Sequence, residues 1–174
     1  MSNKVETGTD DLLADLTAGV LTLTMNRPEA RNAMSDAMTG ALAQQLADAE
    51  LNSAVKVIVL TGAGKGFCAG GDVKGMAASG DGTVGDNTID GAIHRQRLNQ
   101  RGTAGALYSM PKPTIAALPG AAAGAGLSLA LACDMRIMAS SAMMTTAFAK
   151  VGFSGDYGGT FFMSQLIGTA KARE

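Results

Sequence analysis

Hydrophobic and polar positions along the chain predict strands and helices in turn. Residues 20–25 (VLTLTM) alternate apolar and polar side chains, as a half-buried strand does. Residues 35–51 carry apolar side chains at helical spacing, and Ser35 is a suitable N-cap for that helix. Pro28 marks the turn between the two segments. Together they form one strand-turn-helix unit.

The same unit recurs three times further along the chain. Each repeat begins with a short apolar run and continues into a glycine-rich turn, and the three runs are residues 55–61, 114–118 and 135–140. The acidic segment before them, residues 1–19, is expected to be a leader outside this pattern. Four units in succession predict one layered α/β domain that spans residues 1–174.

Two segments lie between the second and third units. Residues 79–91 are rich in Gly, Asp and Thr, with almost no large apolar side chain, so we expect a surface loop. Residues 92–110 are expected to form a helix that ends at the Pro-Lys-Pro break of residues 111–113.

Residues 114–133 contain no charge over twenty positions, which is long enough to cross a membrane. Pro119 and three glycines interrupt this stretch, however. A buried strand, a glycine turn and a buried helix that starts near Gly126 explain the pattern better. We therefore expect no membrane partner.

Composition narrows the function classes further. Of the 174 residues, 47% are hydrophobic and 17% are charged, and the formal net charge is −1, so no basic field exists for a nucleic acid partner. Cys68 and Cys133 lie far apart without a CxxC or His-rich neighbourhood, which favours reduced thiols over a disulfide or a metal site. The N-terminus lacks the features of a secretion signal, so a cytoplasmic protein is expected.

The glycine corner KGFCAGGDVKGM, residues 65–76, follows a predicted buried strand, as phosphate-binding loops do. The spacing excludes both common phosphate motifs. A Walker loop would need glycine at Val59 and a hydroxyl residue at Gly66, and a dinucleotide fingerprint would need glycine at Phe67 or Leu129.

Glycine corners can instead present bare backbone N–H groups to a ligand, with help from the dipole of a following helix. The sequence has two such corners, residues 68–71 and residues 124–126. Two N–H donors that converge on one oxygen form an oxyanion hole, which suits a carbonyl that becomes an enolate.

Five motifs in this order resemble the crotonase (enoyl-CoA hydratase/isomerase) superfamily, from about Leu21 to the end of the chain. They are NRPEARNAM, FCAGGD, PKPTIAAL, PGAAAGAGLSLALACD and GDYGGTFFMSQLIG. The resemblance implies a ββα spiral core that binds an acyl-CoA thioester and stabilises its enolate through two backbone N–H groups. It implies no cofactor beyond the CoA of the substrate.

The resemblance also assigns residues to these roles. By motif position, the two N–H donors are Ala69 and Ala125. The residues expected to line the CoA site are Arg27, Ala69, Gly70, Gly71, Asp72, Val73 and Gly124. Asp72 is expected to cap the short helix that follows it, and a catalytic role is the less favoured alternative.

Hydratases of this family use two glutamates, and their expected positions fall on Ser128 and Phe148 here. Residues 145–152 contain no acid at all, so efficient hydration is not expected. Asp156 stands where isomerase and dehalogenase branches of the family carry a working aspartate. The resemblance therefore favours an isomerase with Asp156 as its proton shuttle. Alternatively, Asp156 only caps the turn into a helix at Gly158.

Three other residue types are weaker candidates. His94, the only histidine, is expected on a solvated helix face, and Cys68 is expected to be a buried filler instead of a nucleophile. The methionines, Met143 and Met144 among them, fit an acyl pocket and ordinary core packing equally well.

Family members continue well past residue 174, and their C-terminal helical region usually completes the acyl pocket and the trimer. The given sequence does not include that region. If the region exists, we expect a homotrimer or a dimer of trimers. Two alternatives stay open: a hydratase or other enolate chemistry, and a CoA-binding or assembly module without catalysis.

Overall fold

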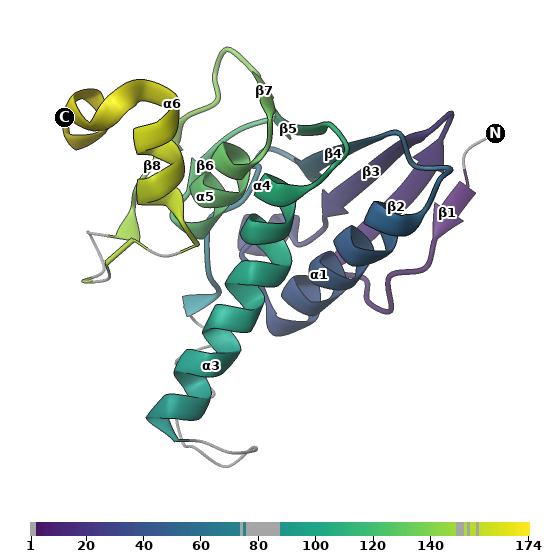
Figure 1. Cartoon of the computed structure of the whole chain (residues 1–174), viewed down its shortest axis with the longest axis horizontal. Coiled ribbons are helices and arrows are strands. Elements are labelled where there is room, and N and C mark those ends of the chain that lie inside the picture. Colours follow the sequence, from purple (N-terminus) through teal and green to yellow (C-terminus); the bar gives the residue numbers. More distant parts are fainter. Residues whose placement is uncertain (1–2, 74, 76–87, 149–151, 153, 156) are drawn as a thin grey trace.

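A computed structural model describes residues 3–73, 75, 88–148, 152, 154–155 and 157–174. Its main sheet has six strands in the order β1-β2-β3-β4-β5-β7 (Figure 1). The first three pair antiparallel: β1 (Asn3–Val5), β2 (Leu12–Thr17) and β3 (Val20–Met25). The other three extend the sheet in parallel: β4 (Val57–Gly62), β5 (Thr114–Leu118) and β7 (Met135–Met138).

The prediction that residues 1–19 form a leader outside the fold is wrong, because they contain β1 and β2. Leu12 and Ala14 are buried on one face of the sheet while Leu13 is 48% exposed, which is the alternation of an ordinary strand. Ala18 and Gly19 have φ angles of 51° and 86°, as a two-residue hairpin turn requires. The hairpin therefore joins β2 to β3, and this segment is part of the sheet.

Helix α1 (Asp36–Leu51) begins where the sequence predicted. The hydroxyl of Ser35 accepts a hydrogen bond from the N–H of Met38 at 3.1 Å. Figure 1 shows α1 lying across β2 and β3, and its Leu42 and Leu46 are fully buried in the core. Before α1, the turn after β3 contains the short 3-10 helix η1 (Pro28–Ala30).

The next helical segment consists of α3 (Ile89–Gln100), a π-helical turn η2 (Arg101–Gly105) and α4 (Ala106–Ser109). It begins three residues before the predicted start at residue 92. Thr88 is the reason, because its hydroxyl accepts from the N–H of Gly91 at 3.0 Å and caps the helix there. In Figure 1, α3 projects away from the sheet.

The uncharged stretch 114–133 divides as predicted into β5, the short strand β6 (Ala122–Ala123) and the buried helix α5 (Ala125–Ala132). β6 pairs in parallel with β8 (Met144–Thr145), and α6 (Gly159–Arg173) packs on α5. Within the described ranges, no helix has both the length and the apolar character that a membrane span needs. The fold is the predicted α/β arrangement.

Candidate active site

The two glycine corners, which lie about fifty residues apart in the sequence, meet in space. The N–H of Cys68 donates to the Ala121 carbonyl at 3.2 Å, and the Cys68 carbonyl accepts from Ala123 at 2.9 Å. A Cβ atom on Gly126 would lie 2.4 Å from the Cys68 oxygen, and one on Gly70 would lie 3.0 Å from the Ala123 oxygen. Glycine therefore permits this close contact.

Most N–H groups of the first corner, residues 68–71, and of Asp72 after it serve the fold. Four of them donate within the chain: Cys68 to the Ala121 carbonyl, Ala69 to the Arg31 carbonyl at 3.0 Å, Gly70 to the Cys68 Sγ atom at 3.4 Å, and Asp72 to the Met34 carbonyl at 3.2 Å. The N–H of Gly71 has no hydrogen-bond partner in the part of the chain that the structure describes.

The structure therefore contradicts the expectation that the Ala69 N–H faces a ligand, since that N–H already binds the Arg31 carbonyl. Gly71 pairs with Met34 in a parallel bridge, in which the flanking residues Gly70 and Asp72 bond to Met34. In such a bridge the central residue directs its own N–H to the opposite side. The free donor of this corner is thus two residues beyond the predicted one.

The second corner leads into α5. Gly124 has a φ angle of 54°, its N–H donates to the Thr145 carbonyl at 3.1 Å, and its carbonyl accepts from Ser128. The N–H of Ala125, the first helical residue, has no intrachain partner among the described residues, as the first turn of a helix requires. The Ala125 nitrogen lies 3.4 Å from the Cβ position of Gly70, so this donor lies at the contact between the corners, beside the residue that precedes Gly71.

An ion pair joins the first corner to the turn after β3. Arg27 Nη1 donates to Asp72 Oδ2 at 2.9 Å and to the Ala33 carbonyl at 2.8 Å. Asp72 Oδ1 accepts from the N–H of Gly75 at 3.0 Å, which is the geometry of the expected cap. The structure thus brings together Arg27, Asp72 and the neighbouring Val73, which is 51% exposed. All three were expected to line the CoA site.

Asn32 is a structural residue of the site that the sequence did not single out. It is fully buried and has a φ angle of 56°. Its amide donates to the carbonyls of Ala63 and Gly66 at 2.9 Å each, and its oxygen accepts from the N–H of Arg27. Asn32 therefore holds the approach to the first corner against the turn of Arg27. Its tolerance of a positive φ angle was the available signal.

The positions expected for hydratase glutamates are not acidic. Ser128 is fully buried, and its Oγ atom lies 3.4 Å from the Gly124 carbonyl. A Cβ atom on Gly159 would lie 2.5 Å from that Oγ atom, so the start of α6 covers Ser128. Phe148 is half-buried, and its ring contacts Gly155.

Asp156, the predicted proton shuttle, lies outside the described residues. The residues on either side of it are described. Gly155 lies against the Phe148 ring and Thr160, and Tyr157 is 8% exposed.

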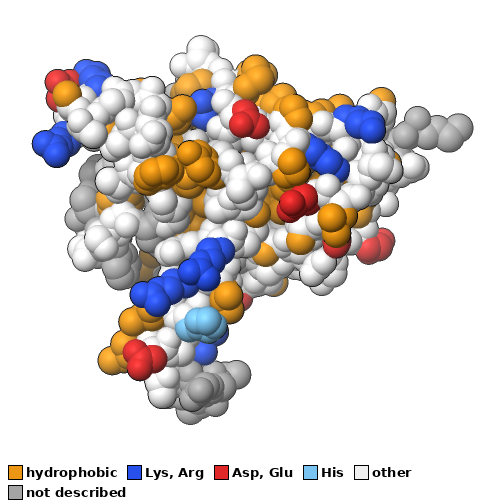
Figure 2. Space-filling view, in the orientation of Figure 1, with side chains coloured by type: hydrophobic (Ala, Val, Ile, Leu, Met, Phe, Trp, Pro, Cys, Tyr) orange, Lys and Arg blue, Asp and Glu red, His pale blue; other side chains and the backbone are white. Residues whose placement is uncertain are grey.

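Neither of the remaining candidates has the surroundings of a reactive group. Cys68 and Cys133 are buried, and burial raises the pKa of each thiol to about 12, so both are protonated and inert at neutral pH. His94 is exposed on α3, where Figure 2 shows it in pale blue. The described ranges contain no cluster of acidic, His or Cys side chains that could hold a metal ion.

Comparison with known proteins agrees with this geometry. A model of the family described as enoyl-CoA hydratase/isomerase matches residues 15–174. The 1,2-epoxyphenylacetyl-CoA isomerase of Escherichia coli K12 is 39% identical over 161 residues, which cover 92% of this chain and 60% of the relative. The mitochondrial enoyl-CoA hydratase domain-containing protein 2 of Mus musculus is 40% identical, over 90% of this chain and 50% of that protein.

A solved enoyl-CoA hydratase from Polaromonas sp. JS666 has the same fold, with a TM-score of 0.81 and 34% identity over 94% of this chain and 61% of that one. The chain thus spans between half and about three-fifths of the length of these relatives. Fold, motif order and sequence identity agree over nearly all of its residues. The chain therefore belongs to the enoyl-CoA hydratase/isomerase family, the crotonase superfamily.

Proposed function

We propose that this chain binds an acyl-CoA thioester and stabilises the thioester enolate between the N–H groups of Gly71 and Ala125. The observation that carries the proposal is the pair of unpartnered donors at the contact of the two corners. The first donor replaces Ala69, whose N–H is already bonded. Backbone donors held rigidly by a fold stabilise a developing oxyanion without reorganising during the reaction.

The proposed reaction moves a double bond within the acyl chain. The Asp156 carboxylate takes a proton from the α-carbon of a 3-enoyl thioester, and the electron pair of that C–H bond passes into a dienolate. The same carboxyl group returns the proton at the γ-carbon, which leaves the double bond conjugated with the thioester. Atoms and charge balance with one acid, and no cofactor besides the CoA of the substrate takes part.

Two observations favour an isomerase over a hydratase. Ser128 and Phe148 occupy the positions where a hydratase would carry its glutamates, and neither side chain can serve as a base at neutral pH. In addition, one of the most similar relatives is named an isomerase.

The CoA portion is proposed to lie along Arg27, Gly70, Gly71, Asp72, Val73 and Gly124. The Arg27 to Asp72 ion pair, with both side chains about one-fifth exposed, fixes the turn against the corner. This contact supports the placement because it holds an arginine beside the corner that carries the Gly71 donor.

A hydratase is the second candidate, because other similar proteins are named enoyl-CoA hydratases. A CoA-binding module without catalysis is the third.

A trimer or a dimer of trimers, in the cytoplasm, is proposed as the working state. The exposed apolar side chains of Met135, Ile137 and Met138 on the edge strand β7 support an assembly through this part of the chain.

The test is the conversion of a 3-enoyl-CoA to its conjugated 2-enoyl isomer, followed by the absorbance of the product. Wild type and Asp156→Asn are compared, with CoA binding and thermal unfolding measured on both. We expect conversion by wild type and a loss of at least 10²-fold in the variant at unchanged CoA affinity. Conversion that survives in Asp156→Asn would contradict the one-acid mechanism, and hydration of 2-enoyl-CoA by wild type would favour the hydratase.

A further inference from the structure

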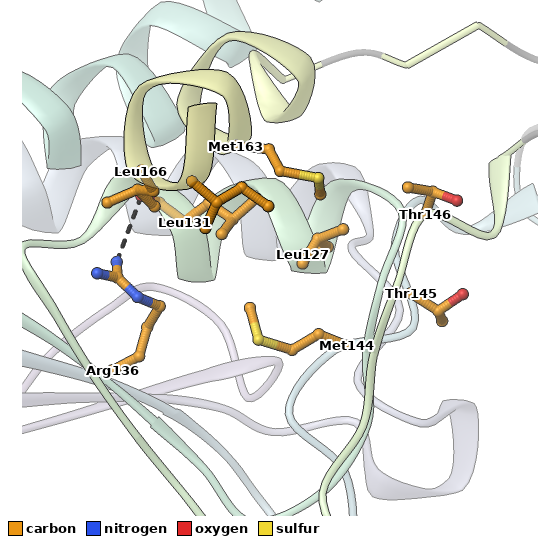
Figure 3. Close-up of a pocket in the computed structure, with 9 residues that line it drawn as sticks. Leu127, Leu131, Arg136, Met144, Thr145, Thr146, Met163 and Leu166 are labelled. Carbon is orange, nitrogen blue, oxygen red and sulfur yellow. Dashed lines mark hydrogen bonds between the residues drawn. The ribbon is translucent and has the colours of Figure 1, made fainter. Parts of the chain in front are cut away.

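A hollow of about 470 Å³ lies beside α5, lined by side chains of α5, α6 and β8. Figure 3 shows Leu127 and Leu131 of α5 and Met144 of β8 directed into it. Most of its lining is apolar: Leu127, Leu131, Met144, Met163, Leu166 and Ile167. Its volume falls within the range of roughly 300–1,000 Å³ that is usual for small-molecule sites.

Arg136 of β7 is the only charged residue that lines this hollow within the described residues. Its Nη1 atom donates to the Cys133 carbonyl at 2.7 Å and its Nη2 atom to the Asp134 carbonyl at 3.2 Å, which places these donors at the C-terminal end of α5. Weaker contacts of 3.4 and 3.5 Å reach the Ala130 and Leu131 carbonyls. The guanidinium therefore caps α5 with one of its edges.

The other edge of this guanidinium is not used. The Nε–H group of Arg136 makes no hydrogen bond, and Arg136 forms no ion pair, within the part of the chain that is described. Arginine has five N–H donors, and its Nε and Nη2 groups can together grip a carboxylate with two parallel bonds. Helix carbonyls carry only partial charge, so the full positive charge of Arg136 has no anionic partner among the described residues.

The hollow begins close to the proposed oxyanion site. Thr145 and Thr146 line one end of it, and the Thr145 carbonyl accepts from the N–H of Gly124, the residue before Ala125. Arg136 stands at the opposite end of α5. Eight helical residues separate the two ends by about 12 Å, which suits an acyl chain of medium length.

We propose that Arg136 selects acyl-CoA substrates whose acyl chain ends in a carboxylate. This inference rests on the proposed function, because the thioester must bind at Gly71 and Ala125 for its chain to enter the hollow. The apolar side chains of α5, β8 and α6 then cover the methylene groups. The terminal carboxylate receives the Nε–H and Nη2–H bonds of Arg136.

The experiment compares the binding of two saturated thioesters of equal length, octanoyl-CoA and the mono-CoA thioester of octanedioic acid, by isothermal titration calorimetry. We expect wild type to bind the carboxylate thioester roughly 10-fold to 100-fold more tightly, which is the size of a charge-assisted hydrogen-bond pair. Arg136→Gln is expected to abolish this preference. Saturated thioesters do not react, so the measurement does not depend on isomerase activity.

A second variant covers the risk that Arg136→Gln disturbs the α5 cap. Met144→Glu places a carboxylate of the protein in the hollow without changing the cap, and it is also expected to abolish the preference. Equal binding of both thioesters by wild type, or a preference that survives in both folded variants, would overturn the role of Arg136 but not the proposed function. Failure to bind either thioester, or CoA itself, would overturn the proposed function. Equal binding by a protein that is dimeric in light scattering would assign the hollow to a second copy of the chain and also overturn the inference.

Discussion

The two glycine corners have similar compositions, yet they provide a free N–H group in different ways. In residues 68–72 three donors bond to the carbonyls of Arg31, Met34 and Ala121 in other segments, and the Gly70 N–H bonds to Cys68 Sγ. Only the Gly71 N–H has no partner among the described residues. At Ala125 the free N–H follows from the start of a helix, where no earlier carbonyl is available. A donor of the second kind is visible in a sequence, whereas one of the first kind depends on contacts that only the folded chain reveals.

The largest expected effect comes from separating the corners. Gly126→Ala places a Cβ atom 2.4 Å from the Cys68 oxygen and 2.7 Å from its Cβ, so one corner must move. We expect a loss of about 4 kcal/mol in the free energy of unfolding, measured by chemical denaturation. Gly40→Ala is the matched control, because Gly40 lies in α1 with nothing within 4 Å of its Cβ position. That control is expected to stabilise the protein by about 0.5–1 kcal/mol.

If Gly126→Ala unfolded like the Gly40→Ala control, the close contact between the corners would be refuted.

The next effect concerns catalysis and isolates the second corner. Ala125→Pro removes the proposed N–H donor at the first helical position, where proline is well tolerated. We expect kcat for 3-enoyl-CoA isomerisation to fall roughly 10²-fold to 10³-fold, the usual loss for one oxyanion donor. The midpoint of thermal unfolding should change by only a few degrees. Full activity in a folded Ala125→Pro protein would exclude this N–H from the oxyanion site.

A smaller effect is expected where the first corner is tied to the turn of Arg27. Asp72→Ala removes the bond to Arg27 Nη1 and the cap on Gly75, so it should cost about 1–2 kcal/mol of stability. Asp72→Asn keeps one acceptor oxygen, which can serve either Arg27 or the N–H of Gly75, so it should cost less. Because Asp72 acts as a cap, Asp72→Asn should retain most of the proposed isomerase activity in the 3-enoyl-CoA assay. A stable Asp72→Asn protein without that activity would indicate a direct catalytic role instead.

The smallest effect concerns the two buried thiols: Cys68 lies in the first corner, and Cys133 lies at the C-terminal end of α5. Burial raises the pKa of Cys68 and Cys133 from 9.0 to about 12, so the folded state disfavours the thiolate. Their contribution to stability is complete below pH 9 and is lost as the pH rises towards 12. We expect the unfolding midpoint to fall over this range less steeply in Cys68→Ala than in wild type. Equal slopes would show that Cys68 does not contribute.

Periodicity predicted the parts of this fold that depend on local pattern. The strand at 20–25, the Ser35 cap and the division of the uncharged stretch 114–133 follow from alternation, capping chemistry and glycine placement. The strand at 12–17 was missed because Asp15 lies within it and a short apolar alternation resembles an acidic leader. Element boundaries moved by a few residues where a cap such as Thr88 was overlooked.

The candidate site was predictable only in part, for a physical reason. The motifs placed the two corners together, but the direction of an N–H in an irregular turn is set by its hydrogen-bond partners. Ala69 and Gly71 differ in this respect because Arg31 and Met34 approach the turn from another part of the chain. The role of Asp156 remains a prediction from sequence.

The parallel pairing of β4 with β5 has a consequence for the order of folding. The hydroxyl of Thr61 reaches the Ala117 carbonyl across 56 residues, whereas β2 and β3 are joined by a two-residue turn. Closing a long loop costs more chain entropy than closing a hairpin, so the β2–β3 hairpin should form early and the β4–β5 pairing late. Because the contact between Cys68 and Ala122 depends on that late pairing, a refolding chain should acquire the proposed CoA site in the slowest kinetic phase.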